Sequence, residues 1–248
     1  MKLLILTLCC FCASLAMTAK ADIPKPITLA AADWCPYTCP SNENPGIVVE
    51  YLQQILTPYN ITLDIQYLPW SRAIEEVNTG RISGLVTAVP SEAPALLFTS
   101  EATMNYNVCL YSRISSNWQY TDPSSLQKHV LGAALNYSYD EDIDLYIQKN
   151  QDSGTITFIT GNHKVFRFTS MLLSNRIDTF IGDKYVIGWE AKNENIDMQE
   201  IKINQCLQSH PFYLALNPSL SWSKEFVDLL DKNLSLEKNR INLLKIIN

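Results

Sequence analysis

Acidic and aromatic residues follow two apolar segments that have the length of short buried strands. Asp33 and Trp34 come directly after the segment 27–32, and Asp183 comes directly after the segment 179–182. In open α/β sheets, ligands bind beyond the carboxyl ends of the strands. Carboxylate, hydroxyl and aromatic groups at such a position can hold a small polar molecule. The spacing therefore predicts a binding site that is formed by strand-end loops.

Further candidates lie at other strand ends and at the start of a helix. Trp70 opens a helix predicted over 69–79, where its ring can stack on a flat or cationic ligand. Thr87 and Ser91 supply hydroxyls after another apolar segment, and Tyr37 lies in a short loop between two cysteines. The full set of predicted ligand-binding residues is Asp33, Trp34, Tyr37, Trp70, Arg72, Thr87, Ser91, Tyr137, Ser138, Asp183 and Tyr185.

Several of these residues also have an interpretation that needs no ligand. Asp33 and Trp34 fit a turn aspartate beside a packing tryptophan, and Trp70 fits a cover over a hydrophobic core. Arg72 fits a surface salt bridge, which contributes little to stability. Tyr37 fits packing at the surface. Both interpretations remain open for each residue at this point.

Residues for catalysis or metal binding do not form a recognisable pattern. No Ser-His-Asp arrangement and no glycine-rich phosphate loop occurs, and the histidines lack a metal-ligand spacing. These histidines are His129, His163 and His210. Glu92, Asp33 or Asp183 could act as a general acid or base in an enzyme. The sequence therefore favours a protein that binds without chemistry, and it predicts no cofactor and no metal.

The first 21 residues have the pattern of an export signal. Lys2 precedes an apolar run over 3–17, and Ala19-Lys20-Ala21 fits a small-x-small cleavage site. A membrane anchor is the alternative, but it needs about 20 apolar residues, and this run is shorter. A lipoprotein signal is disfavoured because the residues before the three cysteines of this segment are not small. We therefore expect cleavage after Ala21 and a periplasmic location.

The charge of the remaining chain excludes some partners. Cleavage after Ala21 would remove two lysines and no acid, which takes the formal net charge from −6 to −8. An acidic exported protein is a poor candidate for binding nucleic acid or an anionic membrane surface. No later apolar run has the length of a membrane span, so no membrane insertion is predicted after signal cleavage.

Four cysteines remain after the predicted signal and indicate disulfide bonds. An even number of cysteines in an oxidising compartment favours pairing. Cys35 and Cys39 lie in one loop, so the expected pairs are Cys35–Cys39 and Cys109–Cys206. A zinc site and buried free thiols are the alternatives. Two cysteines separated by three residues, with two distant ones, are not a usual zinc-ligand set.

A helix, a tight turn and a strand occur in the same order twice. Arg81-Ile82-Ser83 and Arg176-Ile177-Asp178 stand at corresponding places in the two copies. Each copy ends in a polar loop beyond its strand. Two copies of one α/β unit predict two similar small domains. Their facing strand-end loops would form a cleft.

The order of the elements predicts an α/β fold with two lobes. The expected strands cover 27–32, 61–67, 85–89, 107–112, 130–135, 156–159, 179–182, 198–203 and 212–216. The expected helices cover 46–56, 69–79, a segment from 140 on, 164–173, 184–192, 226–234 and 241–247. Residues 22–111 with 207–248 would form lobe 1, and 112–206 would form an inserted lobe 2. Each lobe is expected to be a mostly parallel sheet flanked by helices, and two crossing strands would permit hinge closure.

Several motifs together resemble a known family. They are the export signal, Asp33-Trp34, Leu68-Pro-Trp-Ser-Arg-Ala, Gly80-Arg81-Ile82, Asn175-Arg176-Ile177-Asp178 and Phe212-Tyr-Leu-Ala-Leu. They are similar to bacterial extracellular solute-binding proteins of family 3, which are periplasmic type II binding proteins associated with polar amino-acid uptake. The resemblance spans the chain after the signal. It implies two α/β lobes, a solute closed between them and delivery to an inner-membrane ABC transporter.

The resemblance also bears on individual residues. Asp183 falls where the second lobe of the family offers an acid to a ligand amine. In the amino-acid binders of the family, an arginine in a Ser/Thr-Pro-Glu-Arg stretch clamps the ligand carboxylate. Here the segment 89–94 reads Val-Pro-Ser-Glu-Ala-Pro and has no arginine. A bidentate guanidinium is hard to replace, so Arg72 is the candidate substitute and the ligand is left open.

Three functions are compatible with this sequence. The main hypothesis is a periplasmic protein that captures a small polar solute for a membrane transporter. Some relatives on this scaffold are dehydratases of cyclic carboxylates, so an enzyme is the first alternative. A module that reports its ligand to a membrane receptor is the second alternative, because the chain itself carries no signalling domain.

Overall fold

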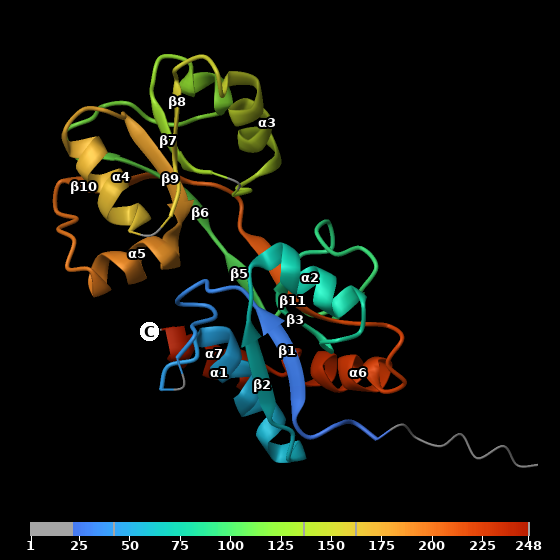
Figure 1. Ribbon diagram of the computed structural model, residues 1–248. Helices are drawn as coiled ribbons and strands as arrows, with labels where there is room; N and C mark the ends of the chain where they lie inside the picture. The colour runs from blue at the N-terminus through green and yellow to red at the C-terminus, as the bar shows by residue number, and fades with distance from the viewer. Residues whose placement is uncertain (1–21, 42, 136, 162, 248) are drawn as a thin grey trace, which may run out of the picture.

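Two sheets flanked by helices form two lobes that are joined by crossing strands (Figure 1). The computed structural model describes residues 22–41, 43–135, 137–161 and 163–247. We call the unit around the first sheet lobe 1 and the unit around the second sheet lobe 2. The predicted α/β fold with two lobes is confirmed. The predicted signal, residues 1–21, lies outside the described residues.

The sheet of lobe 1 has the strand order β2-β1-β3-β11-β4, and β5 also pairs with β11. Strand β1 is parallel to both β2 and β3, whereas β11 is antiparallel to β3, β4 and β5. These strands are β1 Ile27–Ala31, β2 Leu63–Tyr67, β3 Gly84–Ala88, β4 Leu97–Phe98, β5 Met104–Tyr106 and β11 His210–Leu216.

The sheet of lobe 2 has the strand order β10-β6-β9-β7-β8. Strand β7 is parallel to β8 and β9, and β6 is antiparallel to β9 and β10. These strands are β6 Val108–Arg113, β7 Leu131–Ala134, β8 Ile156–Ile159, β9 Thr179–Asp183 and β10 Ile201–Cys206. The parallel part of each sheet thus directs its strand ends to the same edge, where strand-end loops can meet.

Helices cover the faces of both sheets. Lobe 1 carries α1 Ile47–Leu56, the short 3-10 helix η1 Thr57–Tyr59, α2 Trp70–Asn78, α6 Ser223–Leu234 and α7 Glu237–Ile247. Lobe 2 carries the 3-10 helix η2 Pro123–Leu126, α3 Glu141–Asn150, α4 Lys164–Leu173 and α5 Lys184–Asn193. Within the described chain, no helix is both long and apolar enough to span a membrane.

The repeated unit of the sequence is present in both lobes as α2–β3 and α4–β9. Two residues beyond the end of each helix lies a residue with left-handed backbone, Gly80 with φ 76° and Asn175 with φ 58°. Glycine and asparagine tolerate this conformation better than other residues, which is why they terminate helices. The two turns therefore reverse the chain in the same way and return it to the edge where β3 and β9 begin.

Alternation along the strands sends side chains to a core on each face of the sheet. In β1, Leu29 and Ala31 pack with α1 and α6 on one face, whereas Ala30 packs with α2 on the other. In lobe 2, Leu131 packs in the core beside α3, and Phe180 packs in the core beside α4. Because helices bury both faces, β1 and β3 are buried along almost their whole length, whereas the edge strand β2 alternates and exposes Asp64 and Gln66.

The chain passes between the lobes at two places that lie side by side. The first passage is Asn107, between β5 and β6, and the second is the segment 207–209, between β10 and β11. Cys109 and Cys206 are paired across β6 and β10 next to this crossing and form a disulfide bond. Cys35 and Cys39 form the other disulfide bond, so both expected pairs are confirmed. The lobe boundaries given above stay a prediction.

Some elements differ from the sequence-based expectation. The expected strand 198–203 begins later, at Ile201, and runs to Cys206, because its register is set by pairing with β6. The short strands β4 and β5 were not predicted. Both pair with β11, and segments of two and three residues are too short to show a period of their own.

The disulfide next to the crossing gives a prediction about stability. Cys109 and Cys206 are 97 positions apart, whereas Cys35 and Cys39 are only four apart. A longer closed loop removes more conformational entropy from the unfolded chain. We expect the double variant Cys109→Ser/Cys206→Ser to lose about 2–4 kcal/mol in the free energy of unfolding. The Cys35→Ser/Cys39→Ser variant should lose less in urea titrations, and a larger loss would contradict this ranking.

A glycine in β3 gives a second stability prediction. A Cβ atom on Gly84 would lie 2.3 Å from the carbonyl oxygen of Ala215 in the neighbouring strand. Overpacking of this kind costs about 1–3 kcal/mol, so Gly84→Ala should lower the free energy of unfolding by that amount. Gly188 in α5 has nothing within 4 Å, and Gly188→Ala should instead stabilise by about 0.5–1 kcal/mol. Urea unfolding tests whether the free energy of unfolding falls in Gly84→Ala and rises in Gly188→Ala.

Candidate ligand-binding cleft

A cleft of about 1080 Å³ lies where the strand-end loops of both lobes meet the crossing strands. Lobe 1 contributes the loop after β1, the start of α2 and the segment after β3. The crossing strands contribute the end of β5 and the start of β11, and lobe 2 contributes the segment after β7. Polar and aromatic lining residues include Asp33, Trp34, Tyr67, Trp70, Thr87, Ser91, Glu92, Tyr106, Tyr137, Ser138, His210, Phe212 and Tyr213.

Seven of the predicted binding residues line this cleft. They are Asp33, Trp34, Trp70, Thr87, Ser91, Tyr137 and Ser138. They come from four separate segments of the chain and from both lobes. Their common position follows from the parallel strands β1, β3 and β7, which end at the edge where the lobes face each other. Their role in binding stays a prediction.

Trp70 and Glu92 form a polar pair on the lobe 1 wall. The indole nitrogen of Trp70, the first residue of α2, donates a hydrogen bond of 3.0 Å to the Glu92 carboxylate. The ring also packs on the core around α2, as the interpretation without a ligand expects, and stacking of Trp70 on a ligand stays a prediction. Partial burial raises the pKa of Glu92, and the hydrogen bond from Trp70 opposes this rise. The hydrogen bond holds the indole edge, which fixes the direction of the ring.

The loop after β1 is folded tightly around Tyr37. The backbone of Trp34 pairs with that of Thr38, and the disulfide between Cys35 and Cys39 closes the same turn. The Tyr37 ring is completely buried and packs against Trp34 with ring centroids 4.3 Å apart. Burial, and then the neighbouring Asp183, raise the pKa of Tyr37. Tyr37 therefore supports the cleft wall from behind and presents no surface to a ligand.

Asp183 is held by hydrogen bonds from both lobes. Its carboxylate caps α5 by accepting the backbone N–H groups of Tyr185 and Val186, each at 2.9 Å. It also accepts the N–H of Asn107 at the crossing and the hydroxyl of Tyr37 from lobe 1, at 2.9 and 3.0 Å. Burial raises the pKa of Asp183, and these hydrogen bonds oppose the rise. In this arrangement the predicted ligand-binding acid joins the two lobes.

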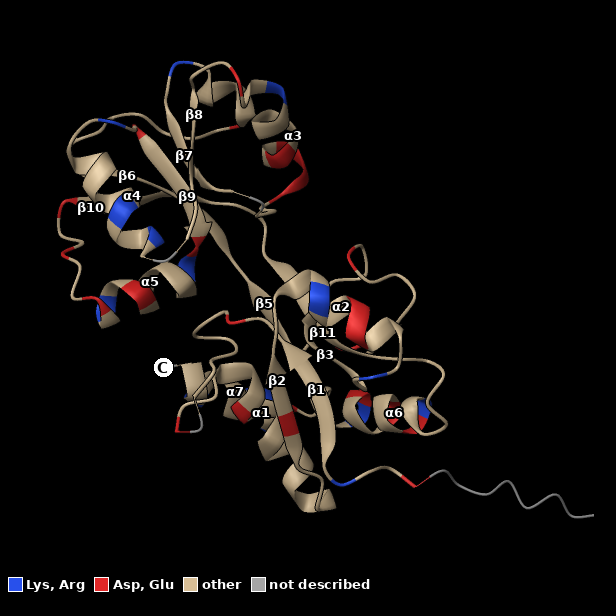
Figure 2. Ribbon diagram, viewed as in Figure 1, with Lys and Arg blue, Asp and Glu red and all other residues tan. Residues whose placement is uncertain are grey.

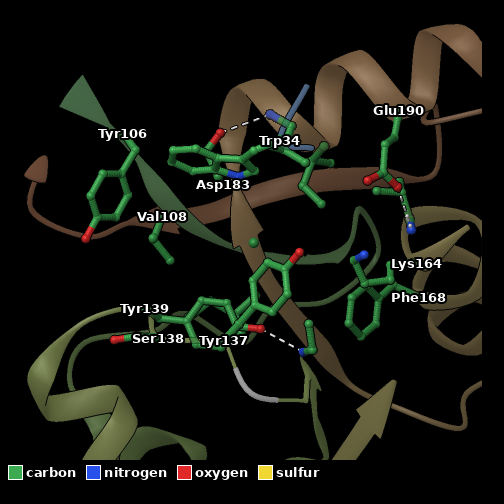
Figure 3. A pocket seen from close by; sticks show the side chains of 16 residues that line it. Trp34, Tyr106, Val108, Tyr137, Ser138, Tyr139, Lys164, Phe168, Asp183 and Glu190 are labelled. Carbon is green, nitrogen blue, oxygen red and sulfur yellow. Dashed lines mark hydrogen bonds between the residues drawn. The ribbon is translucent and has the colours of Figure 1, made fainter. Parts of the chain in front are cut away.

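A smaller pocket of about 80 Å³ adjoins the cleft in lobe 2 (Figure 3). It shares Trp34, Tyr106, Tyr137 and Ser138 with the cleft. Figure 3 shows two charged groups, from α4 and α5, together at the end away from Tyr106.

These two groups are Lys164 and Glu190. Lys164 also lies over the Tyr137 ring, with its nitrogen 5.5 Å from the ring centroid. Burial raises the pKa of Glu190, while its hydrogen bond from Val165 N–H and the charge of Lys164 oppose the rise. The single lysine of this pocket is therefore next to a carboxylate of its own lobe.

The crossing strands place two further side chains in the cleft. The Tyr106 ring stacks on the His210 ring, with centroids 5.4 Å apart. His210 Nε2 lies 3.3 Å from the carboxylate of Asp140, the residue that caps α3 in lobe 2. The first turn of α3 is strongly acidic, as the red segment in Figure 2 shows. The His210 ring therefore lies against the acidic start of α3.

Four predicted residues do not line the cleft: Tyr37 and Asp183, whose positions are given above, and Arg72 and Tyr185. Arg72 lies on the exposed side of α2, where its guanidinium pairs with Glu76 at 3.6 Å and its side chain is 65% exposed. This is the surface salt bridge that the sequence left open as the alternative. Tyr185 packs against Tyr37 and lines a separate groove next to α7. A binding role for Arg72 or Tyr185 gains no support from these positions.

Other lining residues were not identified from the sequence as binding candidates. Tyr67 ends β2, Tyr106 ends β5, and His210 begins β11. The rule that ligands lie at strand ends could have found Tyr67. Tyr106 and His210 needed knowledge of where the chain crosses between the lobes, and no local pattern marks that point.

The cleft can bind a small solute between the lobes. It offers aromatic faces, two hydroxyl groups in lobe 1 and the carboxylates of Asp33 and Glu92. No cluster of acidic, histidine or cysteine side chains suited to a metal is found among the described residues.

Solved structures with the same fold cover nearly the whole chain. An ancestral arginine-binding protein bound to arginine has a TM-score of 0.65 and 14% identity, over 91% of this chain and 97% of that one. A histidine kinase sensor domain with similarity to periplasmic binding proteins has a TM-score of 0.64 and 12% identity, over 89% and 93%. The ancestral amino-acid-binding protein AncCDT-1, a precursor of cyclohexadienyl dehydratase, has a TM-score of 0.62 and 14% identity, over 88% and 93%.

The two-lobed fold of periplasmic binding proteins is thus shared by this chain. At these identities the likeness concerns the fold alone. No protein-family model and no curated protein sequence matches the chain.

The hydrogen bond from Tyr37 in lobe 1 to Asp183 in lobe 2 gives a prediction about stability. Tyr37→Phe removes a donor to the partly buried Asp183 carboxylate and should lower the free energy of unfolding by about 1.5–3 kcal/mol. Tyr59→Phe is the matched control, because the Tyr59 hydroxyl bonds only to the neutral amide of Asn233. That variant should lose about 0.5–1.5 kcal/mol in urea unfolding. An equal or smaller loss for Tyr37→Phe would show that the contact between the lobes contributes little.

Proposed function

We propose that this chain is an exported solute-binding protein that captures a small polar solute between its two lobes. The observation that carries the proposal is the cleft of about 1080 Å³, which both lobes and both crossing strands line. A site formed by two lobes and their connection changes shape when the lobes move. Such a site can enclose a ligand by hinge closure.

The connection between the lobes supports closure. The chain crosses only at Asn107 and at 207–209, so few backbone torsions need to change. On the lobe 2 side, the Cys109–Cys206 disulfide and the Asp183 hydrogen bonds hold the crossing strands firmly. Rotation would therefore concentrate in the short segments next to lobe 1.

Export is supported by the sequence and by the cysteines. Residues 1–21 have the pattern of a cleavable signal, and both cysteine pairs of the described chain form disulfide bonds. Disulfide bonds persist in oxidising compartments such as the periplasm. We propose cleavage after Ala21 and a periplasmic location, with an inner-membrane ABC transporter or a membrane receptor as the partner that receives the loaded form.

An enzyme on the same scaffold is the second candidate. Glu92 lines the cleft and its pKa is raised by burial, which suits a general acid. A similar structure is described as an ancestral precursor of cyclohexadienyl dehydratase. The same carboxylate is already bound to Trp70, and no second acid or base is hydrogen-bonded to it among the described residues, so binding without chemistry is favoured.

A screen of solutes by thermal unfolding tests the proposal. Amino acids, amines, sugars and organic acids would be added one at a time to the purified protein. A ligand present at 100 times its dissociation constant should stabilise the folded state by about 2.7 kcal/mol, which raises the melting temperature by several degrees. Consumption of a hit during incubation would favour the enzyme. A full screen without any stabilising solute would contradict solute capture.

A further inference from the structure

The cleft contains negative charge without matching positive charge. Its lining within the described residues includes the carboxylates of Asp33 and Glu92, one histidine, and neither lysine nor arginine. No ion pair joins either carboxylate to a described Lys, Arg or His side chain. Both side chains retain exposed surface, so the two carboxylates present their charge to the open cleft. A positive group on a bound solute would be attracted to them, because the described lining supplies no lysine or arginine of its own.

The adjoining pocket adds to this imbalance. Among the described residues that line it are Asp183 and Glu190 but only one cation, Lys164. Lys164 lies next to Glu190, over the Tyr137 ring, and donates a hydrogen bond to the carbonyl oxygen of Gly161 at 3.3 Å. The remaining titratable ring, His210, lies 3.3 Å from the Asp140 carboxylate. Each positive group near the cleft is thus close to an acid of the protein itself.

Aromatic rings are frequent in the remaining lining. Two tryptophans, four tyrosines and one phenylalanine line the cleft. Trp34 and Trp70 come from lobe 1, Tyr106 from the crossing strand and Tyr137 from lobe 2, so rings face the space from several sides. The negative face of an aromatic ring attracts a cation, and several rings around one ammonium group form a cage.

The same lining is poorly suited to a carboxylate on the solute. Recognition of a carboxylate relies on arginine, lysine or clustered N–H donors. Arg72 pairs with Glu76 outside the cleft, and Lys164 is already next to Glu190. A carboxylate in the cleft would also meet Asp33 and Glu92 and be repelled by them.

We propose that the solute is an organic cation, such as an amine or a guanidinium compound, and that it needs no carboxylate for binding. Its charged group lies near Glu92 or Asp33, and its carbon skeleton packs between the aromatic rings. This inference rests on the proposed capture of a solute between the lobes and names the chemical class of that solute. The overall negative charge of the chain would also draw cations toward it.

Pairs of compounds that differ by one carboxylate test the proposal. The probes are agmatine with arginine, cadaverine with lysine and tyramine with tyrosine, and succinate and glucose are the anionic and neutral controls. Dissociation constants would be measured by isothermal titration calorimetry on the purified protein. We expect at least one amine to bind about tenfold or more tightly than its amino acid, a difference of about 1.4 kcal/mol.

The outcomes separate the two proposals. Tighter binding of an amino acid than of its amine, or binding of only succinate or glucose, would overturn the organic cation and leave solute capture standing. If neither these probes nor the full solute screen gives any binding, solute capture itself fails. Binding of an amine that weakens as salt is raised supports the cation, because salt screens charge attraction.

A charge-neutral variant identifies the residue responsible. Glu92→Gln keeps an acceptor oxygen for the Trp70 N–H but removes the charge, so binding of the amine should weaken about tenfold or more. Glu75→Gln is the matched control, because Glu75 lies on the exposed surface of α2, the helix that begins with Trp70, and does not line the cleft. It should leave the amine affinity unchanged. If both variants bind the amine like the parent protein, the proposed contact with Glu92 is wrong. The Asp33→Asn variant must then show the tenfold loss of amine affinity. If it does not, the cation proposal fails.

Discussion

The relative position of the two lobes depends on the hydrogen bonds that the Asp183 carboxylate accepts. Four donors converge on it: two N–H groups at the start of α5, one N–H at the crossing and the Tyr37 hydroxyl from lobe 1. Such charge-assisted hydrogen bonds are stronger than neutral ones, and partial burial strengthens them further. The Asp183 carboxylate thereby holds three parts of the chain together: the start of α5, the crossing at Asn107 and the loop after β1. Movement of the lobes must either keep this contact as a pivot or break it.

The carboxylates that line the cleft are not matched by positive side chains in the described part of the protein. Among the described residues, Asp33 and Glu92 face the cleft without a cationic partner, whereas the nearby Lys164 and Arg72 have acids of their own. Both carboxylates retain exposed surface, so their charge acts on the open cleft and makes it attractive to cations. The unpaired carboxylates are therefore the feature that relates this fold to a chemical class of ligand.

Much of the architecture was predictable from local patterns. Apolar periodicity located the helices, and the turn residues Gly80 and Asn175 marked the ends of the two repeated helices. Four cysteines after a predicted export signal were enough to anticipate the disulfide pairs. The short strands β4 and β5 escaped prediction, because two or three residues show no period and their structure exists only through pairing with β11. The late start of β10 has the same cause, since its pairing with β6 decides its register.

The sequence by itself determined most of the longer elements, their order and many of the residues that stand at strand ends, because these depend on neighbours in the chain. Only the tertiary structure decided what each side chain faces. It turned Arg72 to the surface beside Glu76, buried Tyr37 against Asp183, and brought Tyr106 and His210 into the cleft. These outcomes depend on strand register and on the crossing between the lobes. Both are set by contacts between residues far apart in the chain, which the local sequence does not encode.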